Sequence, residues 1–353
     1  MQAGITIALD AMGGDHAPRM VLSGANIARK RFPDVRFIFF GREAELRPQL
    51  DRLKPLAAVS KIVHSDQVVS AEDRPKTVVR QGRESSMGLA IQAVKEGEAV
   101  GAVSAGNTGA LMGLAYFVLR TLPGIDRPAI ASFMPTQRAE SVMLDLGANV
   151  HCDATNLVDF AVMGNVFART VLGLQTPSIG LLNVGSEETK GHEALWEAAE
   201  ILRQAKLPGR FHGFIEGDDI AKGTVDVIVT DGFTGNIALK TAEGTAKLLS
   251  EYIRQTFKSS FLARIGYLFA RGALAKLRQR TDPRRYNGAM FLGLNGIVVK
   301  SHGGTDALGF ANAIGVAVDM ARHGILEKIT ADFDSLSRSA PAPTSPEGQA
   351  AAL

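Results

Sequence analysis

The sequence has one cysteine, Cys152, among 353 residues. A single thiol can form neither a disulfide within the chain nor a zinc site built from cysteines. The chain also lacks a run of about 18 uncharged apolar residues, which a membrane-spanning helix needs. Its first residues carry no basic stretch followed by a long apolar one, so we expect no secretory signal. These absences favour a cytoplasmic location.

Several motifs that hold cofactors or nucleophiles are missing as well. The sequence contains no G-x-x-x-x-G-K-[ST] loop, and no G-x-G-x-x-G follows its first apolar run, so nucleotide sites are not indicated. It has no G-x-S-x-G elbow for a nucleophilic serine. It has no H-E-x-x-H zinc motif, and its acids are not grouped as a magnesium site would need. The sequence therefore predicts no metal and no cofactor.

What is present is an ordinary globular composition, 46% hydrophobic and 21% charged. Apolar runs alternate with amphipathic stretches, and continuous apolar runs are typical of buried parallel strands. We expect strands at residues 5–9, 35–40, 99–104, 128–133, 141–146, 178–184, 210–215 and 225–230. We expect helices at 86–97, 107–121, 156–173, 190–206, 235–257 and 304–323, and a further one beginning at Pro18. This alternation predicts an α/β fold, three-layer α/β/α with a mostly parallel sheet.

The domain organisation follows from the same patterns. Residues 1–334 are expected to form a single α/β domain, from which a helical segment at 245–290 protrudes. Residues 335–353 are rich in Ser, Pro, Ala and Gly, a composition typical of a disordered tail.

Six clusters of Gly, Asp, Asn, Ser and Lys follow strand-like runs. They lie at residues 10–18, 104–110, 145–149, 183–191, 230–236 and 300–306. Each cluster alone is explained by a tight turn or a helix cap. In an open α/β sheet, however, ligands bind beyond the carboxyl ends of the strands. We therefore expect the clusters to gather at one edge and form a pocket for an anion such as phosphate, lined by backbone N–H groups and lysines.

Long segments of these clusters resemble the PlsX-type phosphate acyltransferases of bacterial phospholipid synthesis. The matching strings are DAMGGDHAP (10–18), SAGNTGALM (104–112), GIDRPA (124–129), NVGSEETKG (183–191) and VTDGFTGNIALKTAEG (229–244). The resemblance implies a homodimer with a fold similar to phosphotransacetylases and isocitrate-dehydrogenase-like proteins. It also implies reversible transfer of a fatty acyl group from acyl carrier protein to inorganic phosphate. The acyl phosphate product would feed a membrane glycerol-3-phosphate acyltransferase.

Three residues are candidates for catalysis within these motifs. Lys190 is expected at a helix start, where a cation gains nothing from the helix dipole, so it is assigned to phosphate or to the carbonyl oxygen. Asn236 would donate to the thioester carbonyl oxygen, and His16 would donate to phosphate or take up a proton. The expected substrate-binding residues are Asp10, Gly13, Gly14, Asp15, Ser104, Gly106, Asn107, Thr108, Asp145, Asn149, Asp231, Gly232, Lys300 and His302.

The net charge of +3 conceals one strongly basic segment. Residues 247–285 hold ten Lys or Arg and two acids, a net charge of +8, so the rest of the chain sums to −5. Apolar residues recur there at helical spacing, which predicts two helices broken near Ser259 and Ser260. The segment is interpreted as a dimer interface, a docking site for acidic carrier protein or a contact with anionic lipid at the inner face of the membrane, and not as a nucleic-acid site. The residues expected to contact membrane or carrier protein are Arg254, Lys258, Phe261, Leu262, Arg264, Leu268, Phe269 and Arg271.

Three rival functions remain open from the sequence. A short-chain phosphate acetyl- or butyryltransferase would use coenzyme A thioesters. A dehydrogenase sharing the fold would need a nicotinamide site and acids around a metal. A non-enzymatic peripheral adaptor would bind acyl carrier protein without turning it over.

Overall fold

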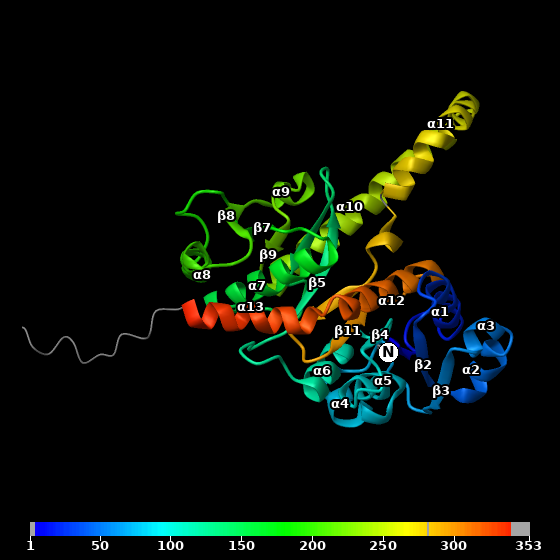
Figure 1. Ribbon diagram of the computed structural model, residues 1–353. Coiled ribbons are helices and arrows are strands. Elements are labelled where there is room, and N and C mark those ends of the chain that lie inside the picture. The colour runs from blue at the N-terminus through cyan, green and yellow to red at the C-terminus, as the bar shows by residue number, and fades with distance from the viewer. Residues whose placement is uncertain (1–3, 281, 340–353) are drawn as a thin grey trace, which may run out of the picture.

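The computed structural model describes residues 4–280 and 282–339. Within them, eleven strands form one sheet in the order β3-β2-β1-β4-β11-β10-β5-β6-β9-β7-β8 (Figure 1). The strands are β1 Thr6–Asp10, β2 Arg36–Gly41, β3 Ser60–His64, β4 Gly101–Ser104, β5 Ala129–Pro135, β6 Glu140–Leu144, β7 Ser178–Leu182, β8 Arg210–Ile215, β9 Val227–Val229, β10 Ala289–Leu292 and β11 Ile297–Lys300.

Helices cover both faces of this sheet. Ile7 and Leu9 of β1 pack in one core with Phe310, whereas Ala8 between them packs in another with Ala90, because successive side chains of a strand point to opposite faces. The expected three-layer α/β/α fold is confirmed. The helices are α1 Arg19–Arg31, α2 Glu43–Leu50, α3 Lys54–Ala57, α4 Pro75–Gln81, α5 Ser86–Lys95, α6 Thr108–Leu119, α7 Ala154–Val171, α8 Glu193–Gln204, α9 Gly217–Lys222, α10 Gly232–Lys258, α11 Phe261–Arg280, α12 Ala307–Arg322 and α13 Ile325–Ser339, with short 3-10 turns η1 Gly82–Glu84 and η2 Pro283–Tyr286.

The sheet reverses direction near its middle. Strand β10 is antiparallel to β11 and to β5, and β5 is antiparallel to β6. After these three reversals, β6, β9, β7 and β8 run opposite to β1, β4 and β11. The expectation that all six polar clusters meet at one edge is therefore wrong. The clusters after β1, β4 and β11 lie at one end of the strands, and those after β6, β9 and β7 lie at the opposite end.

Helices α10 and α11 form a hairpin that projects from the body of the molecule (Figure 1). The expected break near Ser259 and Ser260 is confirmed, since α10 ends at Lys258 and α11 begins at Phe261. The rings of Phe257 and Tyr267 meet edge to face across the hairpin, 5.6 Å between centroids. Helix α10 is roughly 40 Å long, and only its first turn is buried. Within the described residues, every helix is too short or too polar to cross a bilayer.

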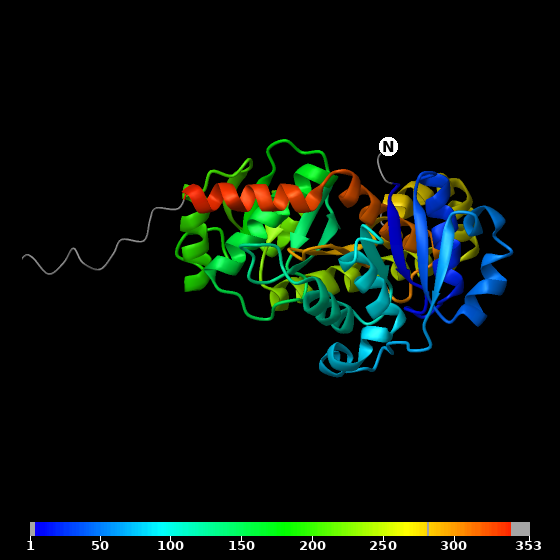
Figure 2. The same cartoon turned by 60° about the horizontal axis from the view of Figure 1, so that its bottom comes forward.

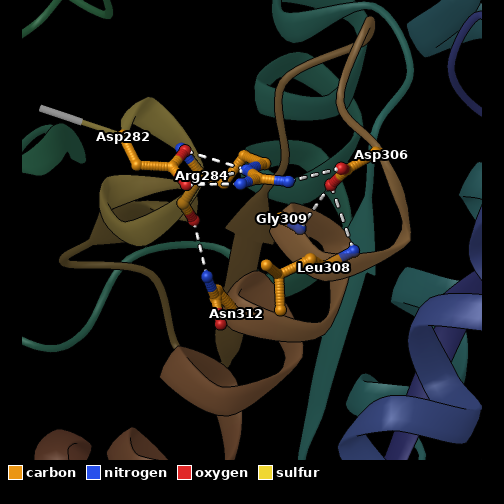
Figure 3. Close-up of polar contacts among 6 residues, drawn as sticks. All are labelled: Asp282, Arg284, Asp306, Leu308, Gly309 and Asn312. Atoms are coloured by element: carbon orange, nitrogen blue, oxygen red, sulfur yellow. Dashed lines mark hydrogen bonds and ion pairs between the residues drawn. The ribbon is translucent and has the colours of Figure 1, made fainter. Parts of the chain in front are cut away.

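A polar clamp fixes the return of the hairpin to the body (Figure 3). The Arg284 guanidinium pairs with Asp282 at 2.6 Å and with Asp306 at 3.0 Å. The side-chain amide of Asn312 donates to the Arg284 backbone oxygen at 2.6 Å. Asp306 also caps α12, so the clamp joins the end of the hairpin to the loop that follows β11.

The C-terminal segment differs in part from its expected disorder. Helix α13 runs to Ser339, so the first residues of the expected tail 335–353 are helical. Residues 340–353 lie outside the described residues, and the extent of the domain stays a prediction.

Candidate active site

A buried carboxylate organises the loops at the ends of β1 and β4. Asp10 is 1% exposed and accepts hydrogen bonds from the hydroxyls of Ser86 and Ser104, both at 2.7 Å, and from the Met12 amide at 3.2 Å. Burial raises the pKa of Asp10 above its ordinary value, while these hydrogen bonds act in the opposite direction. Because Ser104 also accepts from the Gly106 amide at 3.0 Å, Asp10 and Ser104 hold the two glycine turns in place.

These two turns touch each other and a third. A side chain at Gly13 would meet the Gly106 amide nitrogen at 2.8 Å, so this approach requires glycine. Gly14 has a φ of +99°, in the region that favours glycine. The Asp15 amide then donates to the Gly303 oxygen at 3.0 Å. The structure therefore does bring together three of the six predicted clusters, those after β1, β4 and β11.

Lys300 ends β11 beside this junction. Its ammonium donates to the backbone oxygens of Ala105, at 3.5 Å, and Ser301. Burial lowers the pKa of Lys300 to about 8, although the negative charges of Asp10 and Asp15 oppose this change. The amine is thus held where its charge changes close to neutral pH.

One face of α10 lies between the loop after β6 and the loop after β11, which belong to opposite ends of the strands. Asn236, Lys240, Glu243 and Lys247 recur at spacings of four and three residues, so they share that face. The Asn236 side-chain amide donates to a backbone oxygen in the loop after β6, at 3.1 Å. Burial lowers the pKa of His302, and the charges of Lys300, Lys240 and Lys247 add to this effect. Glu243, which pairs with Lys240 at 2.9 Å, acts in the opposite direction. Lys240 and Lys247 were not among the expected site residues, although their spacing from Asn236 was the signal that could have found them.

Asp145 and Asp231, the acids in the other clusters, hold turns, and in the described chain neither bonds to Lys190 or His16. Asp145 is fully buried and accepts four backbone N–H groups at 2.6–3.2 Å, as well as the Asn149 side chain at 3.0 Å. Burial raises its pKa. Asp231 caps α10 and accepts from the Thr234 amide and hydroxyl, both at 2.8 Å. The Gly232 amide donates to the Asn149 oxygen at 2.7 Å, so the loops after β6 and β9 form one unit.

Lys190 lies in the loop between β7 and α8. Helix α8 begins at Glu193, so the expected position of Lys190 at a helix start is wrong. The Lys190 backbone oxygen accepts from the indole of Trp196 at 2.7 Å and from the Asn183 side-chain amide at 3.0 Å. Its side chain is exposed, and no hydrogen bond or ion pair joins it to Asn236 in the part of the chain that the structure describes.

Three further candidates lie at or just before helix starts. Asn107 caps α6 by accepting from the Ala110 amide at 3.0 Å, while its own side-chain amide donates to the backbone oxygens of Ala71 and Asp73 at 2.9 and 3.2 Å. Thr108 follows it and is exposed. His16 is exposed at the turn before α1. Asn107 thus ties the segment before α4 to the start of α6.

Sequence comparison places the chain in a family. The model of a family described as "Fatty acid synthesis protein" matches residues 5–328. A phosphate acyltransferase of Rhodospirillum centenum is 66% identical over 332 residues, which cover 94% of this chain and 93% of the relative. A phosphate acyltransferase of Paramagnetospirillum magneticum is 60% identical over 351 residues, 99% of each chain.

The chain belongs to the phosphate acyltransferase family. It is an acyltransferase that transfers an acyl group to phosphate, and the family resemblance read from the sequence motifs is confirmed. The fold of the acyltransferase is similar to that of the EutD phosphotransacetylase from Staphylococcus aureus, with a TM-score of 0.59 and 18% identity over 90% of this chain and 94% of that one. A phosphotransacetylase from Streptococcus pyogenes gives a TM-score of 0.60 at 18% identity, with the same coverage of both chains. The expected phosphotransacetylase-like fold is therefore confirmed.

Proposed function

We propose that this acyltransferase moves a fatty acyl group from acyl carrier protein to inorganic phosphate and so makes acyl phosphate for phospholipid synthesis. The observation that carries the proposal is the shared face of α10. It runs from Asn236, beside the loop after β6, to Lys240 and Lys247, whose charges act on His302 after β11. A cationic side and an amide donor are what a phosphate nucleophile and a thioester carbonyl require.

Phosphate would bind where the loops after β1, β4 and β11 meet. Lys300 and Lys240 supply positive charge there, and Lys240 also acts on the pKa of Lys300. The turns around Gly13 and Gly106 lie against each other and add backbone N–H groups. His16 and Thr108 stand on the flanking helix starts. This arrangement supports the assignment of these residues to phosphate.

The thioester carbonyl would lie beside Asn236. A side-chain amide has two N–H donors, and Asn236 uses one on the loop after β6. That bond fixes the amide and leaves the second N–H for the developing oxyanion. A preorganised donor of this kind is worth about 2.7–4 kcal/mol. Lys190 is assigned to the same oxygen from the loop after β7.

The reaction then needs no cofactor of its own. A phosphate oxygen attacks the thioester carbon, forms the new C–O bond and pushes charge onto the carbonyl oxygen. Collapse of that intermediate breaks the C–S bond, and the sulfur leaves with the electron pair and takes up a proton. Phosphate is anionic at neutral pH, so alignment, which can supply up to roughly 7–11 kcal/mol, matters more than a strong base.

The hairpin suits a peripheral contact with the membrane. Phe261, Leu262 and Phe269 near its tip are 77%, 79% and 87% exposed. Arg264 lies between them in sequence, and Lys258 and Arg271 lie on either side. An apolar tip with a basic surround binds anionic lipid. The proposal also includes a homodimer. The acyl phosphate would pass to a membrane glycerol-3-phosphate acyltransferase.

Donor specificity tests this function. The purified chain should form acyl phosphate from a long-chain acyl carrier protein and phosphate, but not from acetyl-coenzyme A. Lys190→Ala and Lys240→Ala should keep the fold, measured by circular dichroism, and lose at least about tenfold in turnover. Preference for acetyl-coenzyme A would instead establish a short-chain phosphate acetyltransferase. Binding of carrier protein without any product would leave only the adaptor.

A further inference from the structure

Five exposed cations gather on and around α4 and the end of α6. They form what we call the α4–α6 patch: Arg74, Lys76, Arg80, Arg83 and Arg120. Within the described chain, none of their side chains makes an ion pair or a hydrogen bond. Three acids lie next to the patch in sequence. Glu72 accepts from the Ser70 hydroxyl at 2.6 Å and Asp73 from the Ser70 amide at 2.8 Å, whereas Glu84 is exposed beside Arg83 and forms no ion pair with it in the described chain. The five cations outnumber these three acids, and none of the five is neutralised by a direct ion pair in the described chain.

Two of these arginines are held on one aromatic ring. The guanidinium carbon of Arg83 lies 4.4 Å from the centre of the Phe117 ring, and that of Arg120 lies 5.3 Å from the same centre. Such cation–π contacts orient a guanidinium but leave its N–H donors free. The two arginines come from different elements, so the ring sets their relative position.

The backbone also directs Arg120. Its φ of +62° makes it the sole non-glycine residue of the described chain with a positive φ. The Asn295 amide fixes the turn by donating to the Arg120 oxygen at 2.9 Å. A non-glycine residue held in this region is uncommon and marks a position that the surrounding structure imposes.

Helix α6 connects the patch to the proposed phosphate site. Its start, at Thr108, follows the loop after β4, and Arg120 stands at its other end. The helix has 12 residues, which is about 18 Å. A carrier protein presents its thioester on a long flexible arm, so its docking surface must lie at a distance from the reacting carbon.

From these observations we propose that the α4–α6 patch docks the acidic carrier protein that delivers the acyl group. The inference rests on the donor proposed above. The sequence alone offered the hairpin both for carrier-protein docking and for membrane contact. The proposal assigns docking to the patch, where arginines stack on the half-buried Phe117, and leaves membrane contact to the hairpin tip, where whole apolar side chains are exposed. Figure 1 shows α4 and α6 at the bottom and the hairpin tip at the top right, and in Figure 2 the cyan helices come forward at the bottom.

The test compares one acyl group on two donors. With Arg83→Glu/Arg120→Glu, KM for the acyl carrier protein should rise at least about tenfold, because like charges repel across the contact. The kcat/KM for the same acyl group on free pantetheine, which has no carrier protein, should stay within about twofold of wild type. With carrier protein as the donor, added salt should raise the KM of the wild-type enzyme toward that of the double variant. With the pantetheine donor, salt should have no such effect. The charge-neutral Arg83→Gln/Arg120→Gln should give an intermediate KM.

Arg36→Glu/Arg52→Glu is the matched control, since both arginines are exposed, one at the start of β2 and one after α2, and make no ion pair in the described chain. An unchanged KM for carrier protein in the Arg83/Arg120 variants overturns the docking surface, and so does an equal loss with both donors. If wild type uses acyl pantetheine but no acyl carrier protein, the proposed donor itself is wrong.

Discussion

The indole nitrogen of Trp196 donates a 2.7 Å hydrogen bond to the backbone oxygen of Lys190. The Asn183 side-chain amide donates to the same oxygen at 3.0 Å, and Gly191 follows with a φ of +92°, which favours glycine. The backbone of Lys190 is thus fixed from β7 on one side and from α8 on the other. Trp196 is the single tryptophan of the sequence, so its fluorescence reports on this loop alone.

Trp196→Phe should lower kcat by about threefold to tenfold, because a hydrogen bond contributes about 0.5–1.5 kcal/mol and its loss loosens Lys190. KM for the carrier protein should change little. Asn183→Ala should lower kcat to a similar extent. The fold-loss of kcat in the double variant should be smaller than the product of the two single fold-losses. If Trp196→Phe keeps the wild-type kcat, the tether has no role in catalysis.

Activity toward phosphate should decline above pH 8. Burial lowers the pKa of Lys300 from 10.5 to about 8, so the free enzyme loses this cation as the pH rises past that value. The pH profile of kcat/KM for phosphate measures the effect. Lys300→Arg keeps its charge and should remove the decline, whereas an unchanged profile in that variant would assign the decline to another group.

The free energy of unfolding should rise with pH through Lys300, whereas activity should fall. Between pH 8 and 10.5 the unfolded chain keeps a proton on this residue that the folded chain has lost. Stability therefore rises with pH across that window through Lys300. Urea unfolding of wild type and Lys300→Met, compared at the two ends of the window, isolates this contribution. A difference between the two proteins that stays constant with pH would contradict the lowered pKa.

Asp145→Ala should destabilise the fold by roughly 3 kcal/mol or more. The carboxylate accepts four backbone N–H groups in a buried turn, and an unpaired buried donor costs about 1–3 kcal/mol. Asp231→Ala is the comparison, because it removes a helix cap worth about 1 kcal/mol. Denaturant unfolding gives both values, and equal losses would mean that water replaces the carboxylate.

The hairpin tip should bind vesicles rich in anionic lipid. Phe261→Ser/Phe269→Ser removes two of its exposed rings and should reduce co-sedimentation with such vesicles several-fold. Val150→Ser/Ile201→Ser removes two exposed apolar side chains elsewhere and should bind as wild type does. Wild-type protein that stays in the supernatant would exclude the membrane contact.

The layers and most of the elements follow from the sequence because continuous apolar runs differ from amphipathic ones. Strands β3 and β10 do not show this signal. Ser60–His64 lies at the sheet edge and has only two apolar residues, Ile62 and Val63, and Ala289–Leu292 has only four residues. The reversal of strand direction depends on β10, whose antiparallel partner β5 lies far away in the sequence, whereas the antiparallel pairs β5–β6 and β10–β11 join neighbouring strands.

The candidate site was predictable where motif and topology agree. The loops holding Asp10, Ser104 and Lys300 do meet, as their positions after parallel strands imply. Asp145 and Asp231 show the limit of this reasoning, because an acid in a glycine turn looks the same whether it faces a ligand or its own backbone. The spacing of Lys240 from Asn236 places both on one face of α10, but the proximity of that face to His302 after β11 follows from the structure and not from the sequence.

The clamp between Arg284 and Asp306 closes the base of the hairpin without help from its tip. Ser259 and Ser260 at the tip are exposed and lie outside both helices. Extra chain inserted between these serines would lengthen the projection and leave the body untouched, as exposed loop tips allow. A domain inserted at the tip would therefore hold the proposed membrane contact away from lipid while the body of the enzyme stays folded.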